Sequence, residues 1–136
     1  MAQIWDPLRK KMVALTPEER VRQWFIAVLH EEAGVPFPMM ASEVSLSFGQ
    51  MLEKKPYRAD IVVWDRTLHP AIVVECKRPD IPLTQAVADQ AFRYNQVLES
   101  PYIIITNGKS TYIAHRRAGQ TEFLSALPKY EEICQP

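Results

Sequence analysis

The sequence has only two cysteines, Cys76 and Cys134, and no long apolar run. Two cysteines are too few for the disulfide framework of a small secreted domain. No stretch approaches the roughly 20 apolar residues that are needed to cross a bilayer. Residues 1–11 carry charges where a signal peptide needs an apolar segment. We therefore expect a cytoplasmic protein with no membrane role.

Net charge is also lacking, because 16 basic and 16 acidic side chains cancel. A protein without a net field does not attract nucleic acid or an anionic membrane as a whole, so any polyanion must bind to a local patch. Scattered solvated charges are the alternative reading of its basic residues. The candidate phosphate contacts are Lys54, Lys55, Arg58, Arg78, Arg116 and Arg117.

The length of 136 residues and the hydrophobic fraction of 47% suit one folded domain. A chain of this size can build one hydrophobic core and is too short for two. We expect a single domain over residues 1–136, without internal repeats or a low-complexity tract.

The segment LTPEERVRQWFIAVLHEEAG, residues 15–34, has the ends of a helix. Thr16 can cap it, Pro17 suits its first turn, Glu19 stands where a capping box places a carboxylate, and Gly34 stops it. Its predicted apolar face consists of Val21, Trp24, Phe25, Val28 and Leu29.

Alternating and β-branched segments predict strands after this helix. The segments RADIVVWD and PAIVVECK are joined by a polar turn, which favours an antiparallel pair. The order is helix, three strands, helix, two strands around an Asn107-Gly108 turn, and a short tail helix. These elements cover residues 15–34, 43–48, 58–65, 70–77, 83–100, 101–115 and 130–133. The fold class is therefore α/β, with helices covering a mixed sheet.

The end of the segment AIVVECKRP places chemistry beside a buried strand. Because side chains alternate, Glu75 and Lys77 share one face and Cys76 lies on the other. Asp60 shares a face with Val62 on the preceding strand, and the hairpin can bring it beside Glu75. Converging carboxylates repel one another and favour a hard cation such as Mg²⁺. Lys77 can then hold a water or offset the charge that builds on a phosphate.

A structural role is the alternative for these residues. Glu75 and Lys77 can form an ion pair at a sheet edge, worth about 0–1 kcal/mol if it is exposed. Cys76, on the opposite face, is more typical of a core thiol than of a nucleophile.

The second predicted helix carries an apolar stripe of Val87, Ala91, Tyr94 and Leu98, and Gln90 lies on it. A buried amide needs a partner, and a carboxylate or ammonium at the mouth of the sheet would serve. Gln90 and Tyr94 are therefore candidate supports of the site. The alternative is a glutamine at the margin of the stripe that reaches water.

Two adjacent glutamates begin the first helix. Glu18 stands three residues before Val21 and seven before Phe25, so it is expected on the core side, whereas Glu19 suits the capping role. Glu18 is the better active-site candidate. Its alternative is a first-turn glutamate that the helix dipole favours.

Together the segments TPEERVRQ, RADIVVWD, AIVVECKRP, DQAFRYNQVL and YIIITNG give the sequence a family resemblance over about residues 16–115. They resemble the N-terminal nuclease domain of type I restriction enzyme R subunits, a branch of the PD-(D/E)xK nuclease family. The resemblance implies a restriction-endonuclease-like mixed sheet flanked by helices, with an α-β-β-β-α-β-β core. The Pro-Asp of the family name is Ala59-Asp60 here.

The resemblance also implies the roles of individual residues. Asp60 and Glu75 would ligate Mg²⁺, with Mn²⁺ as a substitute ion, helped by the backbone carbonyl of Cys76. Lys77 would position the attacking water.

Helical residues have implied roles as well. Gln90 and Tyr94 would form the glutamine-tyrosine motif, and Glu18 would be the helix carboxylate, with Glu19 as the second choice.

Two functions follow. The first is a metal-dependent DNA endonuclease of restriction type. The second is a catalytically silent nuclease-like module that binds DNA or a partner protein. The expected partners are DNA, a helicase or methyltransferase subunit and a second copy of the chain in a homodimer. The sequence does not specify the DNA that is recognised, the cut pattern or the oligomeric state.

Overall fold

The computed structural model describes residues 2–46, 57–94 and 100–135, and it contains eight strands and three α-helices in that part of the chain. The strands are β1 (Gln3–Asp6), β2 (Lys11–Ala14), β3 (Met40–Leu46), β4 (Tyr57–Trp64), β5 (Pro70–Cys76), β6 (Tyr102–Thr106), β7 (Thr111–Arg117) and β8 (Gln120–Leu124). The helices are α1 (Pro17–Glu31), α2 (Gln85–Tyr94) and α3 (Tyr130–Ile133), with a 3₁₀ turn at Phe37–Met39.

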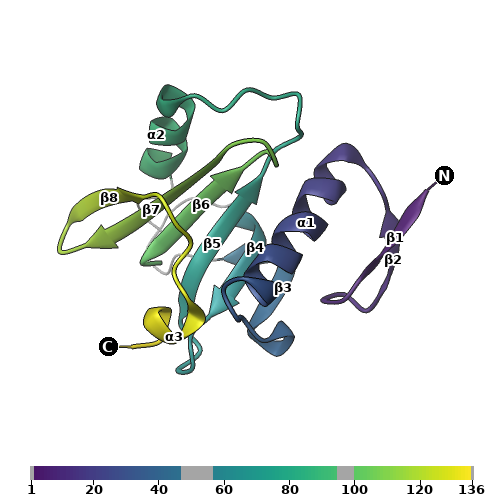
Figure 1. Cartoon of the computed structure of the whole chain (residues 1–136), viewed down its shortest axis with the longest axis horizontal. Helices are drawn as coiled ribbons and strands as arrows, with labels where there is room; N and C mark the ends of the chain where they lie inside the picture. The colour runs from purple at the N-terminus through teal and green to yellow at the C-terminus, as the bar shows by residue number, and fades with distance from the viewer. Residues whose placement is uncertain (1, 47–56, 95–99, 136) are drawn as a thin grey trace.

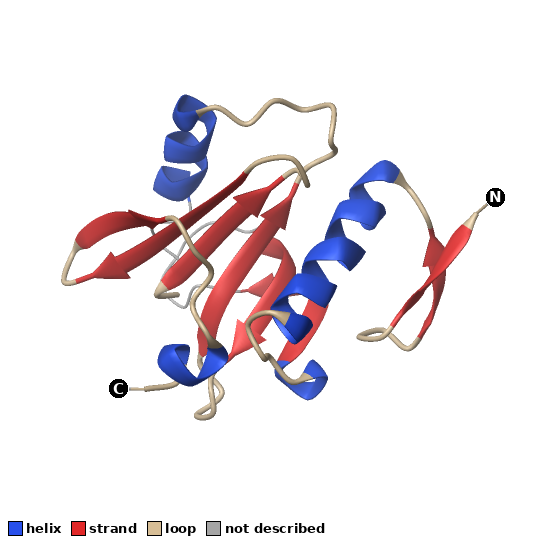
Figure 2. Cartoon of the chain, in the orientation of Figure 1, coloured by secondary structure: helices blue, strands red, loops and turns tan. Residues whose placement is uncertain are grey.

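The main sheet has six strands in the order β3-β4-β5-β6-β7-β8 (Figures 1 and 2). The pair β5–β6 is parallel, and the other neighbours are antiparallel. A parallel connection needs a crossover, which α2 supplies between these two strands. The predicted mixed α/β fold is therefore confirmed, including the antiparallel pair β4–β5.

Helices cover both faces of the sheet. Helices α1 and α3 pack on one face, where the largest hydrophobic cluster includes Phe25, Leu29, Ile72 and Ile133. Helix α2 packs on the opposite face, against strands β6 and β7. This alternation follows the strands themselves, because successive residues of β6 belong to different clusters.

Helix α1 begins as expected, since Thr16 Oγ1 accepts a hydrogen bond from the backbone N–H of Glu19 at 3.0 Å. The predicted apolar face is confirmed for Val21, Phe25 and Leu29, which are buried, and is wrong for Trp24. Trp24 is 44% exposed, whereas Ile26 is buried. The buried side of α1 also includes two charged residues, Glu19 and Arg22.

Helix α2 buries a face that differs in part from the one predicted. Val87 is 38% exposed, while Ala88 and Phe92 are 0% and 5% exposed and pack on β6 and β7. The predicted stripe is therefore wrong for Val87, whereas its member Ala91 is partly buried and packs against the same cluster. Leu98, a member of that stripe, lies outside the described residues.

The sequence patterns missed three strands. Strands β1 and β2 form a separate hairpin beside α1, and β8 extends the main sheet next to β7 (Figure 1). These strands have exposed residues and lack the β-branched runs that revealed the central strands. The short tail helix is confirmed as α3. Within the described ranges, every helix is too short or too polar to cross a membrane.

Candidate active site

Asp60 lies where strands β4 and β5 stop pairing. The last paired residues of their ladder are Ile61 and Val74, and Asp60 Oδ2 accepts a hydrogen bond from the backbone N–H of Cys76 at 2.7 Å. The neighbouring amide of Lys77 donates to Thr106 on β6, so the alternate amide at Cys76 is directed toward β4. The Asp60 carboxylate accepts the hydrogen bond of that amide and is thereby held at the end of β5.

Glu75 and Lys77 lie at the same strand end. Lys77 Nζ is 3.5 Å from Glu75 Oε1, and both side chains are partly exposed. The ion pair that is the structural alternative for these two residues is therefore present. The Glu75–Cys76 peptide carries the N–H that binds Asp60, so the main chains that bear the two acids meet at this point. The carboxylate of Glu75, however, is paired with Lys77.

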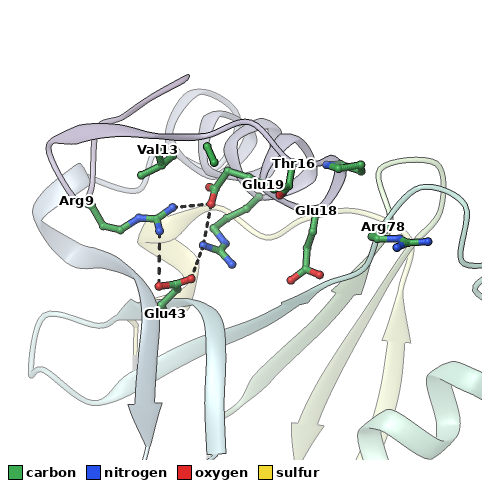
Figure 3. Close-up of a pocket in the computed structure, with 10 residues that line it drawn as sticks. Arg9, Val13, Thr16, Glu18, Glu19, Glu43 and Arg78 are labelled. Atoms are coloured by element: carbon green, nitrogen blue, oxygen red, sulfur yellow. Dashed lines mark hydrogen bonds and ion pairs between the residues drawn. The ribbon is translucent and has the colours of Figure 1, made fainter. Parts of the chain in front are cut away.

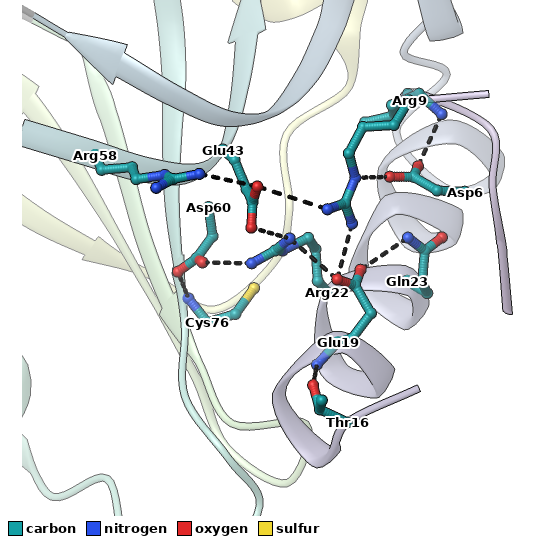
Figure 4. A network of polar contacts seen from close by, with 11 residues as sticks. Asp6, Arg9, Thr16, Glu19, Arg22, Gln23, Glu43, Arg58, Asp60 and Cys76 are labelled. Atoms are coloured by element: carbon teal, nitrogen blue, oxygen red, sulfur yellow. Dashed lines mark hydrogen bonds and ion pairs between the residues drawn. The ribbon is translucent and has the colours of Figure 1, made fainter. Parts of the chain in front are cut away.

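Asp60 also contacts helix α1. Its Oδ1 accepts a hydrogen bond from Arg22 Nη2 at 3.0 Å (Figure 4). The expectation that Asp60 shares the face of Val62 is therefore wrong, because Val62 belongs to a cluster on the side of the sheet away from α1.

Arg22 is surrounded by carboxylates. It is 5% exposed, and its Nη1 lies 3.1 Å from Glu19 and 3.2 Å from Glu43, in addition to the contact of Nη2 with Asp60. Burial disfavours its charge, but the attraction of the three carboxylates outweighs burial and raises the pKa of Arg22 above its ordinary value. The guanidinium thus stays charged at the centre of the cluster.

Glu43 stands opposite Asp60 on β3, between the paired residues Ser42 and Val44. Its φ is 55°, a left-handed conformation that is uncommon for a residue other than glycine. Its carboxylate contacts Arg22 and Arg58. Burial alone would raise the pKa of Glu43, but these arginines lower it. Strained backbone of this kind is often found at functional sites.

A second arginine connects the N-terminal hairpin to the cluster. Arg9, in the turn between β1 and β2, pairs with Asp6 in the same hairpin, with Glu19 on α1 and with Glu43 on β3. Asp6 is fully buried and also accepts from the backbone of Leu8. The hairpin is thereby tied to the same charges as Asp60.

A cavity of about 570 Å³ lies at this cluster, between α1, the hairpin and the strands. Glu18 extends into it, and Arg78 lines it from the segment after β5 (Figure 3). The expectation that Glu18 is the core-facing glutamate and Glu19 the capping one is wrong. Glu19 is 7% exposed and bonds to Arg9, Arg22 and Gln23, whereas Glu18 is half-buried at the cavity.

Of the remaining predicted residues, some are placed by the structure and others lie outside the part that it describes. Gln90 is exposed on α2, so the expectation of a buried amide is wrong. Tyr94 ends α2, and its side chain lies outside the described part. Lys54 and Lys55 lie outside the described residues altogether. The roles implied for Gln90 and Tyr94 remain predictions.

The donor types at the strand end are those that Mg²⁺ prefers, although Asp60 faces α1 and the alternation of β5 places Glu75 on the opposite face of the sheet, with Val73. Asp60 and Glu75 supply carboxylate oxygens, the ligands that this ion prefers, and Mg²⁺ commonly binds through one or two carboxylates and several waters. Their side chains are 19% and 27% exposed, which allows water to reach them. Within the ranges that the structure describes, no group of three or more His, Cys, Asp or Glu side chains is arranged to hold a metal.

The fold and the strand-end acids define an α/β domain with a carboxylate site at the end of its central strands. The chain belongs to the family described as type I restriction enzyme R protein N terminus, which it matches over residues 17–128. None of the curated proteins compared with it matches.

Two solved structures share its fold. One is a fragment described as a candidate HsdR subunit of a type I restriction enzyme from Vibrio vulnificus YJ016, with a TM-score of 0.61 and 24% identity over 89% of this chain. This chain spans 25% of the length of that chain. The other is a candidate nuclease of DUF820 from Anabaena variabilis ATCC 29413, with a TM-score of 0.53, 12% identity, and coverage of 96% of this chain and 84% of that chain.

Proposed function

We propose that the chain is a metal-dependent DNA nuclease domain of restriction type. Its family and the solved structure of a candidate nuclease with a similar fold support the nuclease class. The observation that carries the proposal is the bond of Asp60 to the Cys76 amide, because it fixes one carboxylate to the strand end that bears Glu75 and Lys77.

Each residue of the site has a separate role in the proposed phosphodiester hydrolysis. Asp60 and Glu75, helped by the Cys76 carbonyl, would hold Mg²⁺ or Mn²⁺. The bound ion supplies electrophilic polarisation of the phosphate and a more acidic water. Lys77 orients the attacking water and offsets charge on the phosphate as it builds up. Glu18 extends from α1 into the neighbouring cavity, which Arg22 and Arg78 also line.

DNA is the proposed substrate, and Arg78 is an exposed basic residue that lines the cavity and directly follows Lys77 in the chain. Phosphate contacts from such side chains position a duplex without reading its sequence. Specific protein–DNA interfaces bury on the order of 1,000 Å² of protein or more, which is a large share of a small domain. A helicase or methyltransferase subunit, or a second copy of this chain, would supply the remaining surface.

Plasmid and linear DNA incubated with the purified protein in Mg²⁺ or Mn²⁺ test the proposal. We expect cleavage by the wild type and a loss of about 100-fold or more in Glu75→Gln and Lys77→Met, given the usual size of such contributions. The matched controls Glu122→Gln and Lys109→Met change the same residue types at exposed positions on β8 and in the β6–β7 turn, and should cut normally. Cleavage that survives in Glu75→Gln would exclude this site as the source.

A silent, nuclease-like binding module is the second candidate. It is favoured by the ion pairs themselves, because Asp60 is engaged by Arg22 and Cys76 while Glu75 is engaged by Lys77. This function requires that DNA or a partner protein still binds when wild type and variants alike fail to cut in either metal.

A further inference from the structure

We propose that Arg22 is a positioning residue that competes with a divalent cation for Asp60. When the cation binds, the Arg22 guanidinium gives up its hydrogen bond to Asp60 and pairs with Glu43 instead. The inference rests on the proposed metal-dependent function and goes beyond it, because it assigns a role to two residues outside the acid and lysine set. It predicts opposite effects of removing Arg22 and of removing Glu43.

The first step is the occupancy of Asp60. Its Oδ2 is bound to the Cys76 amide, which belongs to the strand and holds the carboxylate in place. Its Oδ1 is bound to Arg22 Nη2 at 3.0 Å. A cation that takes Oδ1 as a ligand therefore has to displace the guanidinium from that oxygen, since the two positive groups repel each other.

The second step is that Arg22 has another carboxylate within reach. Its Nη1 already lies 3.2 Å from Glu43 Oε1 and 3.1 Å from Glu19 Oε1. Among the described residues, its buried Nε has no hydrogen-bond partner, so the guanidinium has donor capacity left for a new arrangement. Arg22 can give up Asp60 and still remain paired.

The third step is the charge of the cluster. The linked side chains comprise four acids and three arginines, so the cluster has one negative charge in excess: Asp6, Glu19, Glu43 and Asp60 against Arg9, Arg22 and Arg58. A cation added near Asp60 is therefore compatible with the charge of the cluster once Arg22 has moved. The side chain of Glu43 is 36% exposed, which leaves room around it for that movement.

Direct measurement of Mn²⁺ binding, by electron paramagnetic resonance of the free ion and by calorimetry, tests the proposal without relying on cleavage. We expect Arg22→Gln to bind Mn²⁺ about tenfold more tightly than wild type, because a charge in contact with the ligand is lost. We expect Glu43→Gln to bind it several-fold more weakly, because Arg22 then has one alternative partner fewer and holds Asp60 more firmly.

Arg58→Gln is the matched control, because Arg58 contacts Glu43 and is 65% exposed. Its removal changes the charge equally, and screening by solvent should keep its effect below about threefold. In the wild type, Mg²⁺ should also shift the side-chain nitrogen signals of Arg22 in nuclear magnetic resonance spectra and leave those of Arg58 unchanged. Circular dichroism establishes that each variant is folded.

The outcomes separate the two proposals. Mn²⁺ binding by the wild type with equal or weaker binding by Arg22→Gln overturns the competition and leaves the metal-dependent function standing. No Mn²⁺ binding by wild type or by any variant overturns both. If Arg22→Gln does not fold, Glu43→Gln decides, and tighter binding by that variant than by the wild type overturns the competition.

Discussion

Arg22 on α1 and Asp60 on β4, 38 residues apart in the chain, are joined by a hydrogen bond of 3.0 Å. This contact links the first helix to the end of the central strands, where the proposed chemistry takes place. It also matters for the stability of the fold, because removing one partner of a buried ion pair leaves an uncompensated charge and lowers the free energy of unfolding.

Removal of Arg22 should destabilise the fold. Arg22→Met leaves Glu19, Glu43 and Asp60 without their shared cation, and we expect the free energy of unfolding to fall by about 3 kcal/mol. Urea denaturation followed by circular dichroism measures the change. Arg58→Met removes a mostly exposed partner of Glu43 and should cost less than about 1 kcal/mol. Equal losses of unfolding free energy in the two variants would mean that the burial of Arg22 adds nothing to the strength of its ion pairs.

The orientation of α2 can be checked with two substitutions. Phe92 is 5% exposed and Val87 is 38% exposed, although the sequence stripe had favoured Val87 as the buried residue. We expect Phe92→Ala to lower the free energy of unfolding by about 3 kcal/mol, because it leaves a cavity in the core. Val87→Ala should change it by less than about 1 kcal/mol. The reverse ranking in thermal or urea denaturation would contradict this packing.

Backbone strain at the β4–β5 turn gives a stabilising substitution. Leu68 has a φ of 65° and is 69% exposed, so it is strained and buries little. Asparagine tolerates this conformation better, and Leu68→Asn should raise the free energy of unfolding by about 0.5–1 kcal/mol. Gly108→Ala, at a φ of 88°, should act in the opposite direction by about 1 kcal/mol. A loss of stability in Leu68→Asn would show that the turn depends on the leucine side chain.

The two cysteines should differ in reactivity. Burial, reinforced by the negative charge of Asp60, raises the pKa of the Cys76 thiol well above its ordinary value. Cys76 is also 2% exposed, whereas Cys134 is half-buried. We expect iodoacetamide at neutral pH to label Cys134 in the native protein and to label Cys76 only after denaturation. Peptide mass spectrometry distinguishes the sites, and native labelling of Cys76 would show that the strand end opens.

Acid should weaken the arginine cluster. Burial would raise the pKa of Glu43, but Arg22, Arg58 and Arg9 lower it below the ordinary 4.5. A depressed carboxyl pKa contributes stability above the unfolded value that is lost as pH falls through the folded value. The free energy of unfolding should therefore fall below about pH 4.5, and less steeply in Glu43→Gln. Denaturation curves collected between pH 3 and 7 measure both slopes, and parallel slopes would exclude Glu43 as a contributor.

Much of the sheet could be predicted because its central strands are buried on both faces. Strands β4 and β5 are rich in β-branched residues, and that pattern depends on local sequence alone. The strand-end position of Glu75 and Lys77 follows from the same pattern. The strands at the margins, such as β1 and β8, have few buried residues and therefore leave no comparable signal.

The charged cluster could not be predicted in the same way, because its contacts join residues that are distant in sequence. Arg22 precedes Ile26 by four residues and Leu29 by seven, so it lies on the same helical stripe as two buried residues. A charged residue within such a stripe is the one local signal that could have revealed it. Glu43 has no such signal, since its strained φ becomes visible only in the folded strand.

Which face of α2 is buried is decided by the sheet and cannot be read from the helix sequence alone. Val87 with Ala91 and Ala88 with Phe92 are both apolar pairs four residues apart, so periodicity does not choose between them. The apolar face of β6 and β7, which includes Ile103 and Ile105, makes the choice by contact with Phe92 and its neighbours.

The left-handed residue in β3 has a consequence for association between molecules. Strand β3 lies at one end of the described sheet order, where a regular strand would offer free amides and carbonyls to another chain. Glu43 interrupts that regularity with an irregular backbone and an acidic side chain. We therefore expect the same distortion that brings a carboxylate to Arg22 to disfavour the addition of a strand from a neighbouring molecule at this edge.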